Sequence, residues 1–223
     1  MSQGSWDPIW ERVFSSQEWG KYPGEDLIRF IARNFYSKDR KNIRILEIGS
    51  GPGANIWYMS REGFNVFGID GSQTAIDNAM KRLKSDGLNA TLTVGDIISL
   101  PYEDGFFDCV VDMECLYCNN FEKSSLILKE IHRVLKDHGL FYSRTFTDEM
   151  HVGPSSPVSL GEYDTVLEGP LAGKGFVRLA SKESLYKLYR NYFNITSLDK
   201  SDYTLNNGLM KISEWFISCQ KIS

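Results

Sequence analysis

Between residues 43 and 146, short apolar segments alternate with segments of helical periodicity. The apolar segments lie near residues 43–48, 64–70, 91–94, 107–113 and 140–146, and helical spacing is found near 54–61, 72–85 and 124–136. Nearly continuous apolar strands are typical of a parallel sheet that helices cover on both faces. Since crossovers between parallel strands are right-handed, the alternation predicts a doubly wound α/β fold.

The last third of the chain adds a hairpin and an insertion to this pattern. We expect a helix at about 181–190, then two strands near 195–198 and 214–220, with Asn207-Gly208 as the turn of an antiparallel hairpin. The expected sheet is therefore Rossmann-like, seven-stranded and mostly parallel, with an antiparallel edge strand. Residues 148–180 are rich in glycine and proline, which predicts an irregular insertion on the substrate side of the sheet.

The composition argues against several classes of binding partner. There are 25 basic and 29 acidic residues, which gives a net charge of −4 and argues against broad nucleic-acid binding. No apolar run is long enough to cross a membrane, and no export signal is evident, so we expect a cytoplasmic protein. Cys115 and Cys118 form a C-x-x-C motif without a second Cys or His pair, which favours ordinary thiols and no metal site.

Glycines and acids follow three successive strands at their carboxyl ends. Gly49, Gly51 and Gly53 follow the first strand and allow a tight turn and a close approach to a ligand. Asp70 ends the second strand, where a carboxylate can accept hydrogen bonds from both hydroxyls of a ribose. Asp96 follows the third strand, where it could accept from an adenine amino group. Because ligands bind outside the carboxyl ends of such strands, the pattern predicts a nucleoside site.

A dinucleotide-binding dehydrogenase is the main alternative interpretation of this turn. Gly49, Gly51 and Ala54 satisfy G-x-G-x-x-A, and an acid stands where a dinucleotide ribose would need one. A pyrophosphate is an anion, however, and Glu47 and Asp96 would both be unfavourable neighbours for it. The acidic crevice therefore favours a ligand that carries positive charge.

Several motifs together resemble the class I S-adenosylmethionine-dependent methyltransferases of the small-molecule type. They lie at residues 47–53, 68–70, 94–97, 107–113 and 130–140. Asp137-His138-Gly139 stands where this family often has Pro-Gly-Gly, at a turn remote from the cofactor. The resemblance implies S-adenosyl-L-methionine as cofactor and methyl transfer as activity.

The resemblance also implies roles for the residues at the methionine end of the cofactor. Gly49, Gly51 and Gly53 would border the methionine part, and Glu47 would lie near its amino group. Met113 follows the fourth strand and would lie near the sulfonium.

At the nucleoside end, the resemblance implies that Asp70 binds the ribose with Ser72 beside it. Asp96 would contact the adenine amino group, and Ile97 would pack near the ring.

The first 40 residues are rich in aromatic side chains and precede the first strand. One helix is expected to begin near Asp7-Pro8, and another after Pro23-Gly24. Such a segment resembles the N-terminal lids of small-molecule methyltransferases, so we expect a helical lid at 1–40 and the methyltransferase domain at 41–223. Trp10 and Tyr22 are candidates to close over the methionine part, because an aromatic face attracts a sulfonium cation.

The acceptor is the least constrained element of the prediction. Glu114 and Tyr117 follow the fourth strand and His151 follows the fifth, so these three are candidate substrate residues. The predicted function is methyl transfer by direct displacement to an O or N atom of a small polar molecule, selected by the 148–180 insertion. A non-catalytic S-adenosylmethionine-binding module and a protein methyltransferase remain as alternatives. The acceptor, the use of a general base and the oligomeric state stay open.

Overall fold

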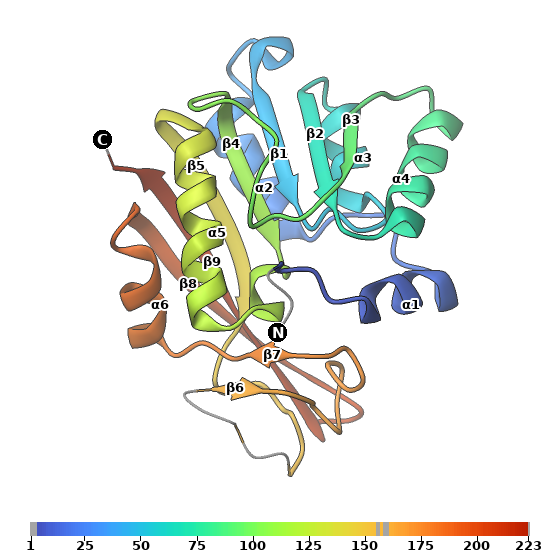
Figure 1. Cartoon of the computed structure of the whole chain (residues 1–223), viewed down its shortest axis with the longest axis vertical. Coiled ribbons are helices and arrows are strands. Elements are labelled where there is room, and N and C mark those ends of the chain that lie inside the picture. Colours follow the sequence, from blue (N-terminus) through green and yellow to red (C-terminus); the bar gives the residue numbers. More distant parts are fainter. Residues whose placement is uncertain (1–3, 155–156, 158–160, 223) are drawn as a thin grey trace.

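The computed structural model of the chain describes residues 4–154, 157 and 161–222. It contains a seven-stranded sheet in the order β3-β2-β1-β4-β5-β9-β8 (Figure 1). The strands are β1 (Arg44–Ile48), β2 (Asn65–Asp70), β3 (Thr91–Val94), β4 (Phe107–Met113), β5 (Leu135–Phe146), β8 (Phe193–Leu205) and β9 (Met210–Lys221). Strands β1 to β5 are parallel, and β9 runs antiparallel to both β5 and β8. The doubly wound sheet and its C-terminal antiparallel hairpin are confirmed.

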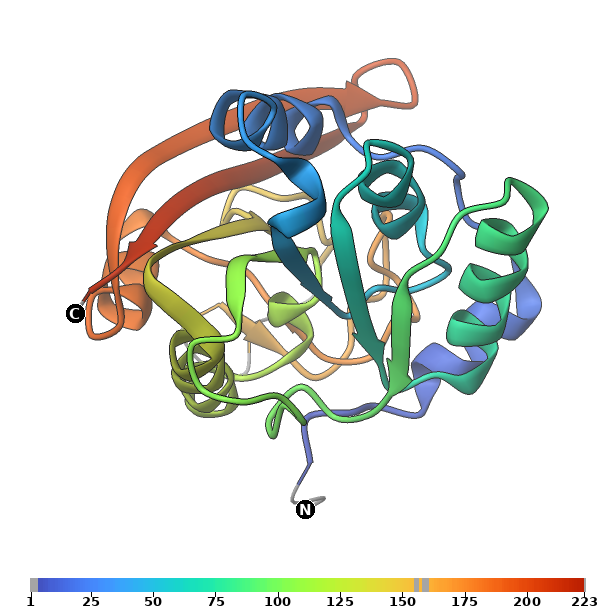
Figure 2. The same cartoon turned by 90° about the horizontal axis from the view of Figure 1, so that it is seen from above.

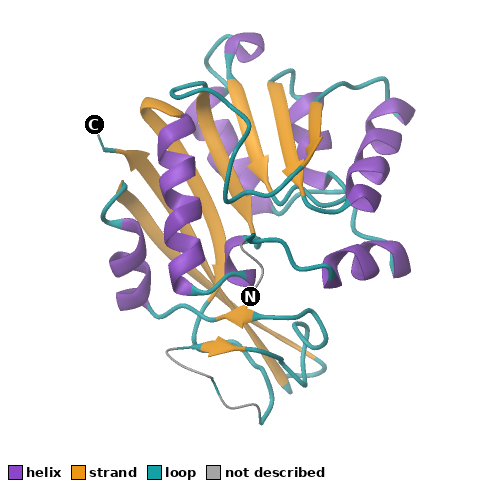
Figure 3. Cartoon of the chain, in the orientation of Figure 1, coloured by secondary structure: helices purple, strands orange, loops and turns teal. Residues whose placement is uncertain are grey.

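Helices cover both faces of the sheet (Figures 1 and 3). On one face, α2 (Glu25–Phe35), α3 (Ala54–Arg61) and α4 (Gln73–Ser85) share a core with β1, β2 and β4, in which Leu27, Ile31 and Ile56 are fully buried. On the other, α5 (Phe121–Val134) and α6 (Lys182–Tyr189) share a core that includes Ile127 and Leu185. Alternating residues of the strands point into the two cores, as a sheet buried on both sides requires. Helix α2 is therefore part of the core of the domain.

Two element boundaries differ from those expected. Helix α5 begins three residues earlier than its apolar periodicity predicts, because the side chain of Asn120 accepts a hydrogen bond from the Lys123 N–H and caps it. The β8–β9 hairpin is much longer than the two apolar segments that predicted it. Its outer half, near 200–205, is polar and mostly exposed, so hydrophobic pattern alone does not reveal it. Figure 2 shows the hairpin wrapping beyond the edge of the sheet.

Helix α1 (Ile9–Ser16) lies at the carboxyl ends of the strands, close to α4 (Figure 1). The Asp7 side chain accepts a hydrogen bond from the Ile9 N–H at 2.9 Å, just before the helix, which begins after Pro8. Helix α2 is buried in the core, and the described residues among the first 40 that line the crevice lie between Ser5 and Gly20. We call residues 4–20 the N-terminal segment.

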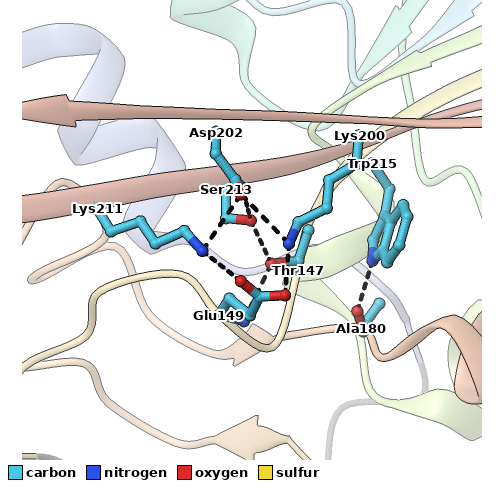
Figure 4. A network of polar contacts seen from close by, with 8 residues as sticks. All are labelled: Thr147, Glu149, Ala180, Lys200, Asp202, Lys211, Ser213 and Trp215. Atoms are coloured by element: carbon cyan, nitrogen blue, oxygen red, sulfur yellow. Dashed lines mark hydrogen bonds and ion pairs between the residues drawn. The ribbon is translucent and has the colours of Figure 1, made fainter.

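The insertion is anchored at both ends to the β8–β9 hairpin (Figure 4). The Thr147 hydroxyl donates to Ser213 at 2.7 Å, and the Trp215 indole N–H donates to the Ala180 carbonyl at 2.8 Å. Glu149 pairs with Lys200 and Lys211, although exposed ion pairs of this kind add little stability. The insertion therefore starts and ends at fixed points beside the crevice.

Within the insertion, β6 (Glu162–Tyr163) and β7 (Val177–Arg178) form a short antiparallel pair. Val166, Leu171 and Val177 are buried in a small core of their own with Phe146 of β5. Residues 155–156 and 158–160, which belong to the predicted insertion, lie outside the described residues.

Candidate active site

The turn after β1 can be built only with glycine at its three key positions. Gly49, Gly51 and Gly53 have φ of 61°, 49° and 76°, in the left-handed region that disfavours other residues. A Cβ at Gly49 would overlap the side chain of Cys115, and one at Gly53 would lie 2.7 Å from the Cβ of Ala79. The turn therefore packs tightly against its neighbours and leaves its backbone open toward the crevice.

Asp70 holds two loops of the crevice together. Its buried carboxylate accepts a 2.8 Å hydrogen bond from the Gly51 N–H and another 2.8 Å bond from the Ser72 N–H. Burial raises the pKa of Asp70, although these two bonds oppose the shift. Because a carboxylate has about four acceptor sites, Asp70 can still accept hydrogen bonds from hydroxyl groups.

The residues that follow β2 and β3 are engaged by the N-terminal segment. Ser72 caps α4 by accepting from the Ala75 N–H, and its hydroxyl donates to Glu11 of α1 at 2.5 Å. Asp96 accepts hydrogen bonds from the Ser5 N–H at 2.7 Å and from the Ser5 hydroxyl. Burial opposes ionisation of Asp96, but the hydrogen bonds from Ser5 and other donors keep its pKa below the usual value.

Two adjoining cavities occupy the crevice. The first cavity, of about 80 Å³, lies between the N-terminal segment and the ends of β2 and β3, where Asp70, Asp96 and Ile97 line it. The second cavity, of about 330 Å³, extends from the glycine turn past Met113 to the insertion. Residues that line both are Trp10, Phe14, Gly49 and Glu114. One elongated ligand can therefore reach from the first cavity into the second.

Glu47 lines the second cavity with an unused acceptor atom. The side chain is 1% exposed, and its Oε1 accepts from the Asn55 amide at 2.5 Å. Its Oε2 has no hydrogen-bond partner among the described residues. Burial raises the pKa of Glu47 to about 8, and Asp70 and Asp112 add to the shift. A bound ammonium would satisfy Oε2 and favour the ionised form, which fits the amino group of a methionine moiety.

We expect Glu47→Gln to stabilise the ligand-free protein at neutral pH. The folded-state pKa lies above the unfolded value, so the carboxyl must either take up a proton or carry an unfavourable charge, and stability is lost as pH rises from about 4 toward 8. Each pKa unit corresponds to about 1.4 kcal/mol, so a gain of at least about 1 kcal/mol at pH 7 is expected. Urea unfolding of both proteins at pH 5 and 7 measures this. Equal pH dependence of the wild type and the variant would contradict it.

A charged cluster forms the wall of the second cavity beyond β4. Glu114 has φ of +62°, uncommon for a residue other than glycine, and its Oε1 lies 3.0 Å from Nε of Arg144. Arg144 also donates to Glu214 at 2.5 Å and lies 3.4 Å from Asp26. Burial raises the pKa of Glu114 to about 7; Arg144 opposes this shift, whereas Glu214 and Asp112 add to it.

Arg144 and Glu214 were not among the residues predicted from the sequence. Each is a charged residue in a strand whose neighbours are largely buried, and that is the signal that could have identified it. Their contact depends on the antiparallel register of β5 and β9, in which Arg144 pairs with Phe216 and Phe146 with Glu214.

The other predicted site residues divide into two groups. Tyr117 is buried and lines the second cavity, and Trp10 lines both cavities. Tyr22 is 72% exposed, packs against Trp57 and lines neither cavity. His151 also lines neither cavity, and its backbone N–H donates a hydrogen bond to the Lys211 carbonyl. The structure thus leaves Tyr22 and His151 outside the crevice.

Arg178 is a further charged residue near the site, and it has structural partners. Arg178 is buried and donates to the Asn119 carbonyl at 3.0 Å and to Ser124 at 3.2 Å, so it fastens the insertion to the start of α5. Across the described ranges, no three His, Cys, Asp or Glu side chains are arranged to hold a metal ion. None of the described helices is both long enough and apolar enough to cross a membrane.

Comparisons with known proteins agree with this geometry. The profile of a family described as "Methyltransferase domain" matches residues 45–139. A solved S-adenosylmethionine-dependent methyltransferase from Methanosarcina mazei is similar with a TM-score of 0.69 and 26% identity, over 80% of this chain and 92% of that one. These matches support a class I S-adenosylmethionine-dependent methyltransferase domain in this chain, and S-adenosylmethionine is the cofactor of that class.

Two curated relatives are similar over part of their length. A phthiotriol/phenolphthiotriol dimycocerosates methyltransferase from Mycobacterium ulcerans is 28% identical over 163 residues, 72% of this chain and 54% of the relative. The norajmaline N-methyltransferase of Rauvolfia serpentina is 30% identical over 141 residues, 60% of this chain and 46% of the relative. The chain spans about half the length of these relatives.

Proposed function

We propose that this protein transfers the methyl group of S-adenosylmethionine to an N or O atom of a small polar molecule. The observation that carries the proposal is the junction of the two cavities at Glu114. A cofactor would extend from the first cavity along the glycine turn into the second, and an acceptor in the rest of the second cavity would meet it near this junction. The second cavity, at about 330 Å³, is of the size that small-molecule sites have. One of the named relatives is a norajmaline N-methyltransferase, and the other is a phthiotriol/phenolphthiotriol dimycocerosates methyltransferase.

In this proposal the chain's own residues bind, orient and accept a proton. The bound cofactor supplies an electrophilic methyl group. Asp70 would hold the ribose, Glu47 the ammonium and the glycine turn the methionine part, which places the sulfonium near Met113. Alignment of the two reactants supplies much of the acceleration in such a displacement. Glu114 would accept the proton that an N–H or O–H acceptor must lose.

The insertion supports a role in acceptor selection. Met150, Pro170, Leu171 and Lys174 all contribute to the wall of the second cavity, opposite the glycine turn. Loops on a rigid sheet are the usual carriers of specificity. We therefore propose that residues 148–180 select the acceptor while the glycine turn and Asp70 bind the cofactor.

A screen for turnover tests the proposed function. The protein is incubated with methyl-labelled cofactor and fractionated metabolite extracts, and S-adenosylhomocysteine and labelled products are measured by mass spectrometry. We expect the label in a small molecule, with Glu114→Gln as the inactive control. Label in protein would favour a protein methyltransferase. Cofactor binding without any turnover would favour a non-catalytic binding module.

Limited proteolysis tests whether the N-terminal segment acts as a lid. Arg12 lies in this segment and Lys21 directly follows it, and both are exposed trypsin sites. Lys38 is an exposed site beyond α2, away from the cavities. We expect S-adenosylhomocysteine to slow cleavage at Arg12 and Lys21, because ligand binding suppresses local opening of the segment. Cleavage at Lys38 is the internal control and should not change. Equal slowing at all three sites would indicate general stabilisation and contradict a lid.

A further inference from the structure

Trp6 occupies the space that a side chain at position 71 would fill. Gly71 directly follows Asp70 and lines the first cavity. A Cβ at Gly71 would overlap the indole ring of Trp6. Gly71 is not among the residues with positive φ, so its backbone conformation does not require glycine. The glycine is therefore explained by the close approach of Trp6.

The backbone on either side of Trp6 is held in place by hydrogen bonds. Ser5 donates to Asp96 through both its N–H and its hydroxyl, and the Trp6 N–H lies 3.4 Å from the same carboxylate. Lys123 of α5 donates to the Gly4 carbonyl at 2.6 Å. On the C-terminal side of Trp6, the Asp7 side chain accepts a hydrogen bond from the Ile9 N–H at the start of α1. The indole is thus positioned by groups from three different parts of the domain.

Most of the acceptor sites of the Asp96 carboxylate are occupied by hydrogen bonds from the N-terminal segment. Besides the bonds from Ser5, it accepts from the Ile98 N–H at 3.0 Å. A carboxylate has about four acceptor sites, so little remains for an adenine amino group. Recognition of the base in the first cavity then needs another contact. The aromatic side chains among the described residues that line this cavity are Trp6, Trp10 and Phe14, and Trp6 is the one that lies against Gly71, next to Asp70.

We infer that Trp6 is a cofactor-binding residue, whose indole supplies the stacking face for adenine that position 71 cannot supply. Asp96 is then a positioning residue that acts through Ser5 to hold this face in the cavity. The inference rests on the proposed cofactor site. It differs from the interpretation of Trp10 and Tyr22 as the aromatic residues of the lid, since it places the stacking at the nucleoside end.

The first test measures the affinity for S-adenosylhomocysteine by calorimetry. We expect Trp6→Ala to raise the Kd by about 5- to 150-fold, the range observed when base-stacking aromatic residues are replaced by alanine. Trp6→Phe should keep most of the affinity. Tyr22→Ala is the matched control, because Tyr22 lies in the same part of the chain and lines neither cavity. Failure of the wild type to bind would refute the cofactor site itself, which is a different outcome.

A double variant separates stacking from a general effect on folding. Met at position 71 would clash with Trp6 but can fill the vacated space when Trp6 is alanine. We therefore expect Trp6→Ala/Gly71→Met to bind more tightly than Trp6→Ala, and Gly71→Met alone to bind more weakly than the wild type. Methylthioadenosine should show the same pattern as S-adenosylhomocysteine, and S-ribosylhomocysteine, which lacks the base, should not. Unchanged or tighter binding by Trp6→Ala would overturn the inference, because the indole would then be either uninvolved or in the place of the base.

Discussion

Replacement of Glu114 by glutamine is expected to reduce the methyl-transfer rate by roughly 10²- to 10⁴-fold, the usual contribution of a general base. Glu114 lines both cavities, and its carboxyl group lies beside Arg144 in the wall of the second cavity. Glutamine keeps the shape of the side chain but cannot accept a proton. The Kd for S-adenosylhomocysteine should stay within about threefold, since no cofactor contact is assigned to Glu114.

The pH dependence of the methyl-transfer rate tests this role of Glu114 most directly. Burial raises the pKa of Glu114 to about 7, so the group is protonated and inactive as a base below that pH. The rate of the wild type should therefore rise through about pH 7, and the residual rate of Glu114→Gln should lack this step. Glu214 raises the pKa of Glu114, so Glu214→Gln should move the step to lower pH. A Glu114→Gln profile that kept the step would show that another group is the base.

The arrangement of the glycine turn, Asp70 and Asp96 around the crevice could be predicted because it is local. Apolar runs in β1, β2 and β3 end at these residues, and the rules for parallel sheets bring those ends together. The positive φ of Gly49, Gly51 and Gly53 follows from the same short motif.

The other contacts around the two cavities could not be predicted, because they join distant parts of the chain. Arg144 and Glu214 meet through the pairing of β5 with β9, which are separated by the insertion and α6. Trp6 lies against Gly71 because hydrogen bonds from Ser5 to Asp96 hold the N-terminal segment there. No spacing in the sequence indicates this contact. Hydrophobic periodicity does not report contacts between polar groups on separate elements.

Asp70→Ala should weaken S-adenosylhomocysteine binding by about 1 to 3 kcal/mol, or roughly 5- to 150-fold in Kd, through the lost hydrogen bonds to the ribose. The substitution also removes the acceptor for the N–H groups of Gly51 and Ser72. A loss of stability of about 1 to 3 kcal/mol is expected from leaving such buried donors unpaired. Calorimetry must therefore be performed well below the unfolding transition of the variant.

Two comparisons make the Asp70 result specific. Asp137→Asn removes a carboxylate whose side chain is 80% exposed and which lies at the amino-terminal end of β5, so the Kd of this variant should equal that of the wild type. Asp70→Asn retains one carbonyl acceptor, so we expect it to lose less stability than Asp70→Ala while still binding the cofactor weakly. NAD serves as the competing ligand, because a dinucleotide site would also use an acid at this strand end. Binding of NAD without binding of S-adenosylhomocysteine would refute the cofactor assignment, whereas a weakened but selective affinity for S-adenosylhomocysteine in Asp70→Ala would place the ribose at Asp70.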